Sequence, residues 1–126
     1  MAIRVDSKLL DEMVRRAIER LPAEFRAALD VVPIRFCPRP TPAQLQSLGL
    51  DESELLLGLY EGIPLTERSV NDGPRVPDQI SLFWEDLEDA CDSVEQLEEE
   101  VRITLFHELG HYFGFDEDQL EALGYG

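Results

Sequence analysis

Two histidines four residues apart have the spacing that most clearly suggests chemistry. His107 and His111, the only histidines of the chain, lie in the segment TLFHELGHYFGFDED (104–118). On a helix, residues four apart lie one above the other on the same face, so both imidazoles can reach one ion. Zinc accepts histidine nitrogens, and catalytic zinc sites keep one of four positions open for water. The alternative is a pair of histidines that is satisfied by hydrogen bonds inside a core.

Glu108 follows His107 directly and lies about 100° around the helix from it. In that direction it is poorly placed as a ligand but can reach a water on the metal. The pattern H-E-x-x-H therefore indicates two metal ligands, His107 and His111, and a general base, Glu108. Burying two imidazoles and a carboxylate in an apolar helix costs free energy unless they have a partner, and a metal is such a partner.

A third protein ligand is expected soon after the second histidine. Gly114 allows the chain to reverse sharply, which brings the next residues back over the metal. Glu117, ten residues beyond His107, completes the pattern H-E-x-x-H-x-x-G-x-x-E and is the expected third ligand. Asp116 and Asp118 flank it and remain alternatives.

The helix that must carry these residues is predicted from about 93 to 113. Ser93 and Gln96 form a capping box at its start, and Gly114 suits the position just past its end. From 101 to 113, apolar residues point in most directions around the axis, which is typical of a buried helix.

The other elements are predicted from hydrophobic periodicity and turn residues. The predicted helices are 7–21, 23–30, 42–48 and 116–125, and the predicted strands are 31–36, 54–65 and 79–84. Pro33 cannot donate to a sheet, so the first strand is expected at an edge. The segment 69–78 is rich in turn residues. The nine acidic residues between 85 and 100 are expected to form a solvated face.

Length and charge restrict the class of protein. The 126 residues suit a single domain, expected over 1–126, with a core that folds without a metal or disulfide. Residues 1–40 carry 8 Lys+Arg against 6 acids, and residues 41–126 carry 3 against 21. The acidic part would repel a polyanion, so no nucleic acid partner is expected.

Compartment and redox state are predicted from the same sequence. No run approaches the roughly 18 apolar residues of a membrane span, and the first 21 residues carry charges every few positions. We therefore expect no membrane association, no secretory signal and a cytoplasmic location. Cys37 and Cys91 form no recognisable framework and are expected to be small buried residues in a reducing compartment.

Three segments together resemble the minimal zincin-like metallopeptidase family of small bacterial proteins: LLGLYEGIPLTER (56–68), QISLFW (79–84) and ITLFHELGHYFGFDED (103–118). The resemblance covers nearly the whole chain. It implies an α+β fold with a compact zincin-like core, in which a small mixed β-sheet packs on a buried active-site helix. The family pattern ends in Asp, where this chain has Glu117. No methionine follows Met13, so the Met-turn of metzincins is absent.

The expected function is zinc-dependent hydrolysis of a peptide or protein substrate. Zinc held by His107, His111 and Glu117 would lower the pKa of a bound water toward neutrality. Glu108 would take the proton and pass it to the leaving amine. The strand 79–84 would bind an extended peptide by adding it to the sheet. The ligands also suit Ni, Co or Fe.

A residue that would stabilise the oxyanion is harder to identify. The candidates are Tyr60, Tyr112, Tyr125, Arg39 and Arg75. Their uncertain role leaves an alternative open, a non-catalytic zincin-fold module that contains zinc and binds a partner. A metal-dependent endoribonuclease is a third interpretation, but a third histidine and a basic surface would be expected for it. Oligomeric state and substrate identity stay open.

Overall fold

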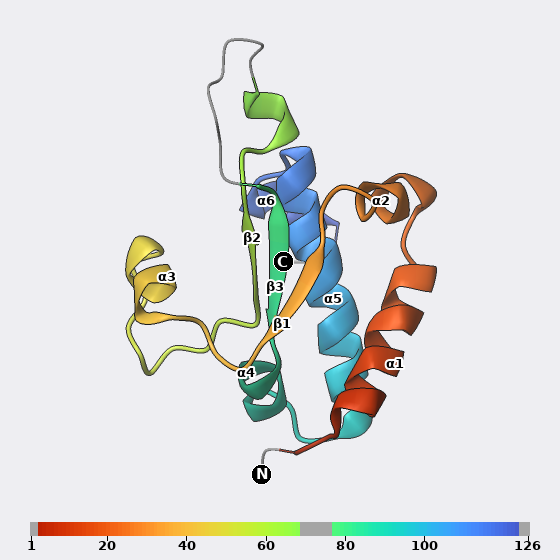
Figure 1. Cartoon of the computed structure of the whole chain (residues 1–126), viewed down its shortest axis with the longest axis vertical. Coiled ribbons are helices and arrows are strands. Elements are labelled where there is room, and N and C mark those ends of the chain that lie inside the picture. The colour runs from red at the N-terminus through yellow and green to blue at the C-terminus, as the bar shows by residue number, and fades with distance from the viewer. Residues whose placement is uncertain (1–2, 69–76, 124–126) are drawn as a thin grey trace.

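A small sheet and a long helix organise the chain, as Figure 1 shows. The computed structural model describes residues 3–68 and 77–123. In chain order the elements are α1 (Ser7–Glu19), α2 (Ala23–Ala28), β1 (Ile34–Cys37), α3 (Pro42–Ser47), β2 (Gly58–Glu61), a 3-10 turn (Leu65–Glu67), β3 (Gln79–Phe83), α4 (Trp84–Asp89), α5 (Val94–Phe113) and α6 (Glu117–Ala122).

The sheet is mixed, with the strand order β1-β3-β2. β3 pairs in parallel with β1 and antiparallel with β2. β1 lies at an edge, as predicted from Pro33. The prediction that residues 79–84 would bind an added peptide strand is wrong, because both sides of β3 are already paired. In the described sheet the strand with an unpaired side next to α5 is β2.

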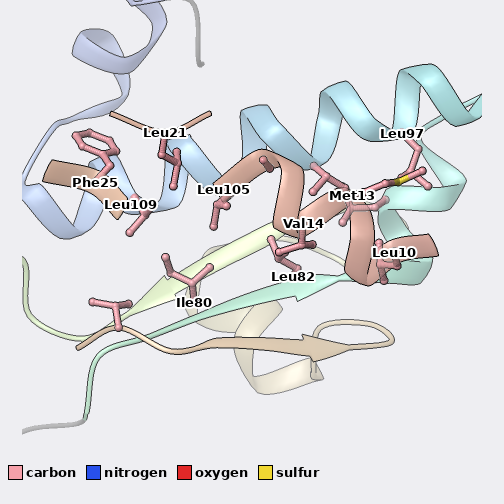
Figure 2. Close-up of a cluster of buried hydrophobic side chains, with 14 of the residues drawn as sticks. Leu10, Met13, Val14, Leu21, Phe25, Ile80, Leu82, Leu97, Leu105 and Leu109 are labelled. Carbon is pink, nitrogen blue, oxygen red and sulfur yellow. The ribbon is translucent and has the colours of Figure 1, made fainter. Parts of the chain in front are cut away.

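The hydrophobic core lies between the sheet and the helices α1 and α5 (Figure 2). The apolar face predicted for the first helix is buried there, including Met13 with no exposed surface. Successive residues of a strand face opposite sides, so Ile80 and Leu82 of β3 enter this core. The predicted α+β architecture, a small mixed sheet packed on a buried helix, is confirmed.

Helix α4 departs from the prediction. The expected strand 79–84 ends at Phe83, and Trp84 begins a helix. Asp86 and Glu88 in this helix are each 2% exposed. The acidic segment is therefore not a wholly solvated face.

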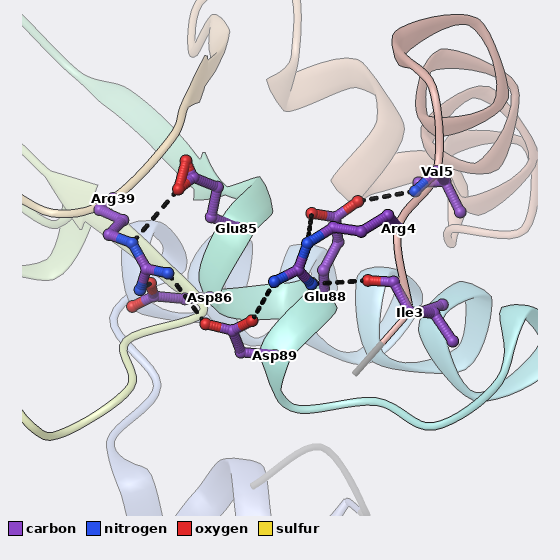
Figure 3. A network of polar contacts seen from close by, with 8 residues as sticks. All are labelled: Ile3, Arg4, Val5, Arg39, Glu85, Asp86, Glu88 and Asp89. Atoms are coloured by element: carbon purple, nitrogen blue, oxygen red, sulfur yellow. Dashed lines mark hydrogen bonds and ion pairs between the residues drawn. The ribbon is translucent and has the colours of Figure 1, made fainter. Parts of the chain in front are cut away.

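Both buried carboxylates are used to bind backbone groups. Leu56 N–H donates to Asp86 Oδ2 at 3.0 Å, and Val5 N–H donates to Glu88 Oε2 at 2.8 Å. Arg39 Nη1 donates to Asp86 Oδ1 at 2.9 Å (Figure 3). These bonds fasten the N-terminal segment and the chain before β2 to α4, a use of acidic residues that composition alone does not reveal.

Some local predictions fail at single residues. Cys91 is buried as expected, but Cys37 is partly exposed; both thiols are free. Residues 69–76, most of the predicted turn segment, lie outside the described residues. No helix in the described part of the chain combines the length and apolar character needed to span a membrane.

Candidate metal centre

Helix α5 brings the two histidines together. Its N-cap is Ser93, whose side chain accepts from Gln96 N–H as predicted, although the Gln96 side chain accepts from Asp92 N–H rather than from Ser93. His107 and His111 lie one turn apart near the other end, and their Nε2 atoms are 3.1 Å apart. The helix therefore presents both imidazole nitrogens to the same point.

Gly114 ends α5 and turns the chain back toward the histidines. It has the left-handed φ of +96°, which glycine adopts at little cost. Phe115 N–H donates to Gly110 O at 2.9 Å, which closes the helix end. Asp116 then caps α6 by accepting from Gln119 N–H at 2.8 Å. Glu117 is the first residue of α6 and faces the histidines.

The Glu117 carboxylate completes a group of three close atoms. Its Oε1 lies 2.8 Å from His111 Nε2 and 3.2 Å from His107 Nε2. Of the three acidic candidates, Asp116 is engaged as a helix cap, and no contact joins Asp118 to the imidazoles. The Glu117 side chain is 69% exposed, so the group is open to solvent on that side.

Gly110 is a second glycine that shapes this turn. A Cβ at this position would lie 2.4 Å from Leu120 Cδ2. Leu120 is fully buried against α5, and it anchors α6. The absence of a side chain at Gly110 thus lets α6 approach α5 closely enough for Glu117 to reach the histidines.

The position of the proton on the His111 ring determines what its Nε2 atom can bind. His111 Nδ1 lies 3.1 Å from Phe115 O, and a carbonyl oxygen only accepts, so Nδ1 carries the proton. In the neutral ring, Nε2 then presents a lone pair to Glu117 Oε1, which is also an acceptor. Two acceptors at 2.8 Å need either a shared proton, as in an imidazolium–carboxylate ion pair, or a metal ion between them. Two imidazole nitrogens and a carboxylate oxygen are a ligand set that suits zinc, and the Nδ1 bond to a backbone carbonyl is the usual support of such a ligand.

Glu108 lies behind this group and is 8% exposed. Tyr60 N–H donates to its Oε1 at 2.7 Å, and its Oε2 lies 3.8 Å from His107 Nε2. Burial raises the pKa of the Glu108 carboxyl, while the two imidazoles and the Tyr60 N–H oppose that rise. The ligand atoms of His107, Glu108 and His111 also lie within 4.8 Å of one another, a looser set than the one with Glu117.

Gly58 explains how β2 reaches Glu108. A Cβ at Gly58 would lie 2.6 Å from Thr104 Cγ2 and 3.5 Å from Glu108 Cγ. The strand therefore packs directly on α5, and the N–H of Tyr60 meets the carboxylate. The role of Tyr60 N–H was missed from the sequence, although a glycine inside a strand is a signal of close backbone approach.

A polar cluster beside the site was also missed. Tyr60 Oη donates to Asp78 Oδ1 at 2.6 Å, and Arg68 Nη2 lies 2.6 Å from Asp78 Oδ2. The Arg68 guanidinium lies over the Tyr112 ring, 5.4 Å from its centroid. Burial and the neighbouring Asp78 carboxylate raise the pKa of Tyr60, so its hydroxyl keeps its proton. Arg68 and Asp78 are 10 positions apart, and no recognised motif links them.

Of the other oxyanion candidates, the two described ones, Arg39 and Tyr112, make contacts elsewhere. Arg39 is bound to the acidic residues of α4 (Figure 3). Tyr112 is buried between Tyr60 and Phe113. Arg75 and Tyr125 lie outside the described residues.

Comparison with known proteins agrees with this arrangement. A family model described as zincin-like metallopeptidase matches residues 29–126, which include the sheet, α5 and α6. Among solved structures, a conserved hypothetical protein from Thermus thermophilus is similar, with a TM-score of 0.56 and 23% identity over 94% of this chain and 97% of that one. At this identity the likeness concerns the fold alone. No curated protein matches the chain.

Proposed function

The chain belongs to the zincin-like metallopeptidase family, and on that basis we propose that it hydrolyses peptide bonds with a metal ion held by His107, His111 and Glu117. The family implies a divalent metal, typically zinc. The observation that carries the proposal is the convergence of two imidazole nitrogens and one carboxylate oxygen within 3.2 Å of one another. Bound there, the metal would supply the Lewis acidity that makes water a nucleophile at neutral pH.

Glu108 is the proposed general base. Its Oε1 is held by Tyr60 N–H at 2.7 Å, which leaves Oε2 on the side of His107. From there Oε2 would take a proton from the attacking water and deliver it to the leaving amine. The fixed bond to the strand keeps this carboxylate in one orientation for both proton transfers.

β2 is the strand along which we propose that the substrate lies. It runs beside α5, and its Tyr60 contacts Glu108. An extended peptide next to β2 would meet the general base and the metal ligands together. We propose a peptide or protein substrate rather than nucleic acid, because residues 41–126 carry 21 acids against 3 basic residues.

A second function, the non-catalytic module that binds a partner, is favoured by one observation. Within the described part of the chain, the Tyr60 hydroxyl and the Arg68 guanidinium bond to Asp78 instead of facing an oxyanion. Capture of one intact partner by wild-type protein, with no cleavage of that partner or of a peptide library, would support the module over the enzyme.

The test of hydrolysis compares wild type with Glu108→Gln. Both proteins, loaded with zinc, are incubated with an unbiased peptide library, and cleavage is read by mass spectrometry. We expect the same zinc content in both and at least a roughly 100-fold lower rate in the variant, since a general base contributes about 10²–10⁴-fold. Glu121→Gln, on the exposed side of α6, is the control and should cleave normally. A Glu108→Gln protein as fast as wild type would refute the general-base role.

A further inference from the structure

A cavity of about 200 Å³ opens beside the candidate metal centre. It lies between α5 and the chain that leads into β2. Its lining residues are Leu56, Leu57, Gly58, Glu100, Ile103, Thr104, His107 and Glu108. Because His107 and Glu108 belong to both, a substrate held at the metal centre could place a side chain in this cavity.

One wall is a single face of α5. Glu100, Ile103 and His107 are separated by three and four residues, so they follow one another along the helix surface. This wall is apolar at Ile103, next to His107, and acidic at Glu100, further along the helix. Glu100 lies about 10 Å along the axis from His107, since each residue of a helix rises about 1.5 Å.

The facing wall is apolar and held in place by backbone bonds. Leu56 and Leu57 supply it. Leu56 N–H donates to the buried Asp86 carboxylate at 3.0 Å, and Leu57 O accepts from Phe83 N–H at 3.0 Å. This wall is therefore fixed by α4 and β3 before any substrate arrives.

Apart from the His107 imidazole, the ionisable groups that line the cavity are acidic. Its lining includes two carboxylates, Glu100 and Glu108, and no lysine or arginine. Glu108 is bonded to Tyr60, but no hydrogen bond or ion pair joins Glu100 to another described residue. Glu100 is partly buried, and its carboxylate is available to a cation.

A long cationic side chain matches these features. Lysine and arginine bury their alkyl stems along apolar surface and keep the charged end near polar groups. We propose that this cavity binds a lysine or arginine side chain of the substrate, with the stem between Leu57 and Ile103 and the charge at Glu100. Glu100 is then the residue that sets specificity. This assignment rests on the proposed function, because it takes the metal centre as the site of reaction.

The experiment measures binding separately from cleavage. Zinc-loaded Glu108→Gln protein is titrated with fluorescent alanine hexapeptides that contain one Lys, one norleucine or one Glu at each position in turn. Norleucine has the lysine stem without the charge. At one position we expect Lys to bind about fivefold more tightly than norleucine, the upper range for a partly exposed ion pair, and Glu to bind most weakly.

Variants with a second substitution test whether Glu100 causes the preference for Lys over norleucine. Adding Glu100→Gln should abolish the advantage of Lys over norleucine, and Glu100→Lys should favour the Glu peptide. Glu95→Gln removes the same charge from an exposed position of α5 outside the cavity and should leave the preference unchanged. Circular dichroism checks that each variant is folded.

The outcomes separate this assignment from the proposed hydrolysis. Lys-selective binding that depends on Glu100, without cleavage by wild type, would support the pocket and contradict the peptidase. Cleavage by wild type with equal binding of Lys and norleucine at every position would overturn the pocket and leave the peptidase standing. Failure of all these peptides to bind would also overturn the pocket.

Discussion

At the scale of single residues, the site depends on which atom of each side chain is already bonded. His111 uses Nδ1 for Phe115 O, and Glu108 uses Oε1 for Tyr60 N–H. Each side chain is thereby held by the backbone and keeps its second polar atom on the side of His107. Such support by backbone groups is what fixes the orientation of metal ligands and bases in other sites.

Glu117 is the proposed third ligand among three neighbouring acidic residues, and substitutions can test this assignment. Glu117→Gln should weaken zinc binding by at least about 100-fold, since loss of a supporting bond alone costs about 10–100-fold. Asp118→Asn is the matched control and should bind zinc as wild type does. Zinc titration against a competing chelator measures both. Equal loss in the two variants would mean that local charge, and not ligation by Glu117, determines affinity.

At the scale of elements, the site requires that α6 folds back on α5. Gly114 provides the left-handed turn, Gly110 provides the room for Leu120, and Asp116 starts the new helix. The three residues act together, because each fixes a different part of the path from His111 to Glu117. The geometry of the proposed metal ligands is therefore coupled to the end of one helix.

Two left-handed glycines allow this coupling to be tested. Gly114→Ala and Gly49→Ala should each lower the free energy of unfolding by about 1 kcal/mol, because a residue with a Cβ is strained in the left-handed conformation. A Cβ at Gly114 would also lie 2.4 Å from Thr66 Oγ1, whereas a Cβ at Gly49 would meet nothing within 4 Å. We expect Gly114→Ala to have a free energy of unfolding, measured in urea, about 2 kcal/mol lower than wild type, and to bind zinc poorly.

Gly49→Ala serves as the control, with the smaller loss of stability and normal zinc affinity. If Gly114→Ala also binds zinc normally, the position of α6 is not what presents Glu117.

Features that depend on residues close in sequence could be predicted, whereas features that depend on distant residues could not. The start of α5 at Ser93, its end at Gly114 and the facing histidines depend on residues a few positions apart, and all were predicted. The central place of β3 and the burial of Asp86 and Glu88 depend on residues distant along the chain. A single sequence shows neither pairing, so β3 was wrongly expected to accept a peptide.

The same distinction holds within the site. The pattern around His107 predicted the three residues that the structure brings together, His107, His111 and Glu117. Tyr60 N–H reaches Glu108 across 48 positions, and Arg68 meets Asp78 across 10. These partners come from packing, which only the fold determines.

At the scale of the whole molecule, the core and the candidate metal centre are separate. The core lies between the sheet, α1 and α5 (Figure 2). The close atoms of His107, His111 and Glu117 lie near the end of α5, where Glu117 is exposed. A chain of this length can bury enough surface to fold on that core. We therefore expect a bound metal to add to stability without being needed for folding.

Chelation tests this separation. Addition of EDTA to zinc-loaded protein should leave the far-ultraviolet circular dichroism unchanged at room temperature and lower the Tm. At free zinc roughly 100-fold above Kd the metal contributes about 2.7 kcal/mol, enough for a shift of several degrees. His111→Ala should melt at the same temperature with and without EDTA. Complete unfolding on chelation would show that the core depends on the metal.

We propose that His107, His111 and Glu117 form a metal site, and the metal content of the protein is the most immediate test. Elemental analysis is carried out on wild type and on His111→Ala, both purified without a histidine tag. We predict about one zinc per wild-type chain and almost none in the variant. Wild-type protein without metal and without tight zinc uptake on titration would contradict this metal site. A variant with the same zinc content as wild type would also contradict it.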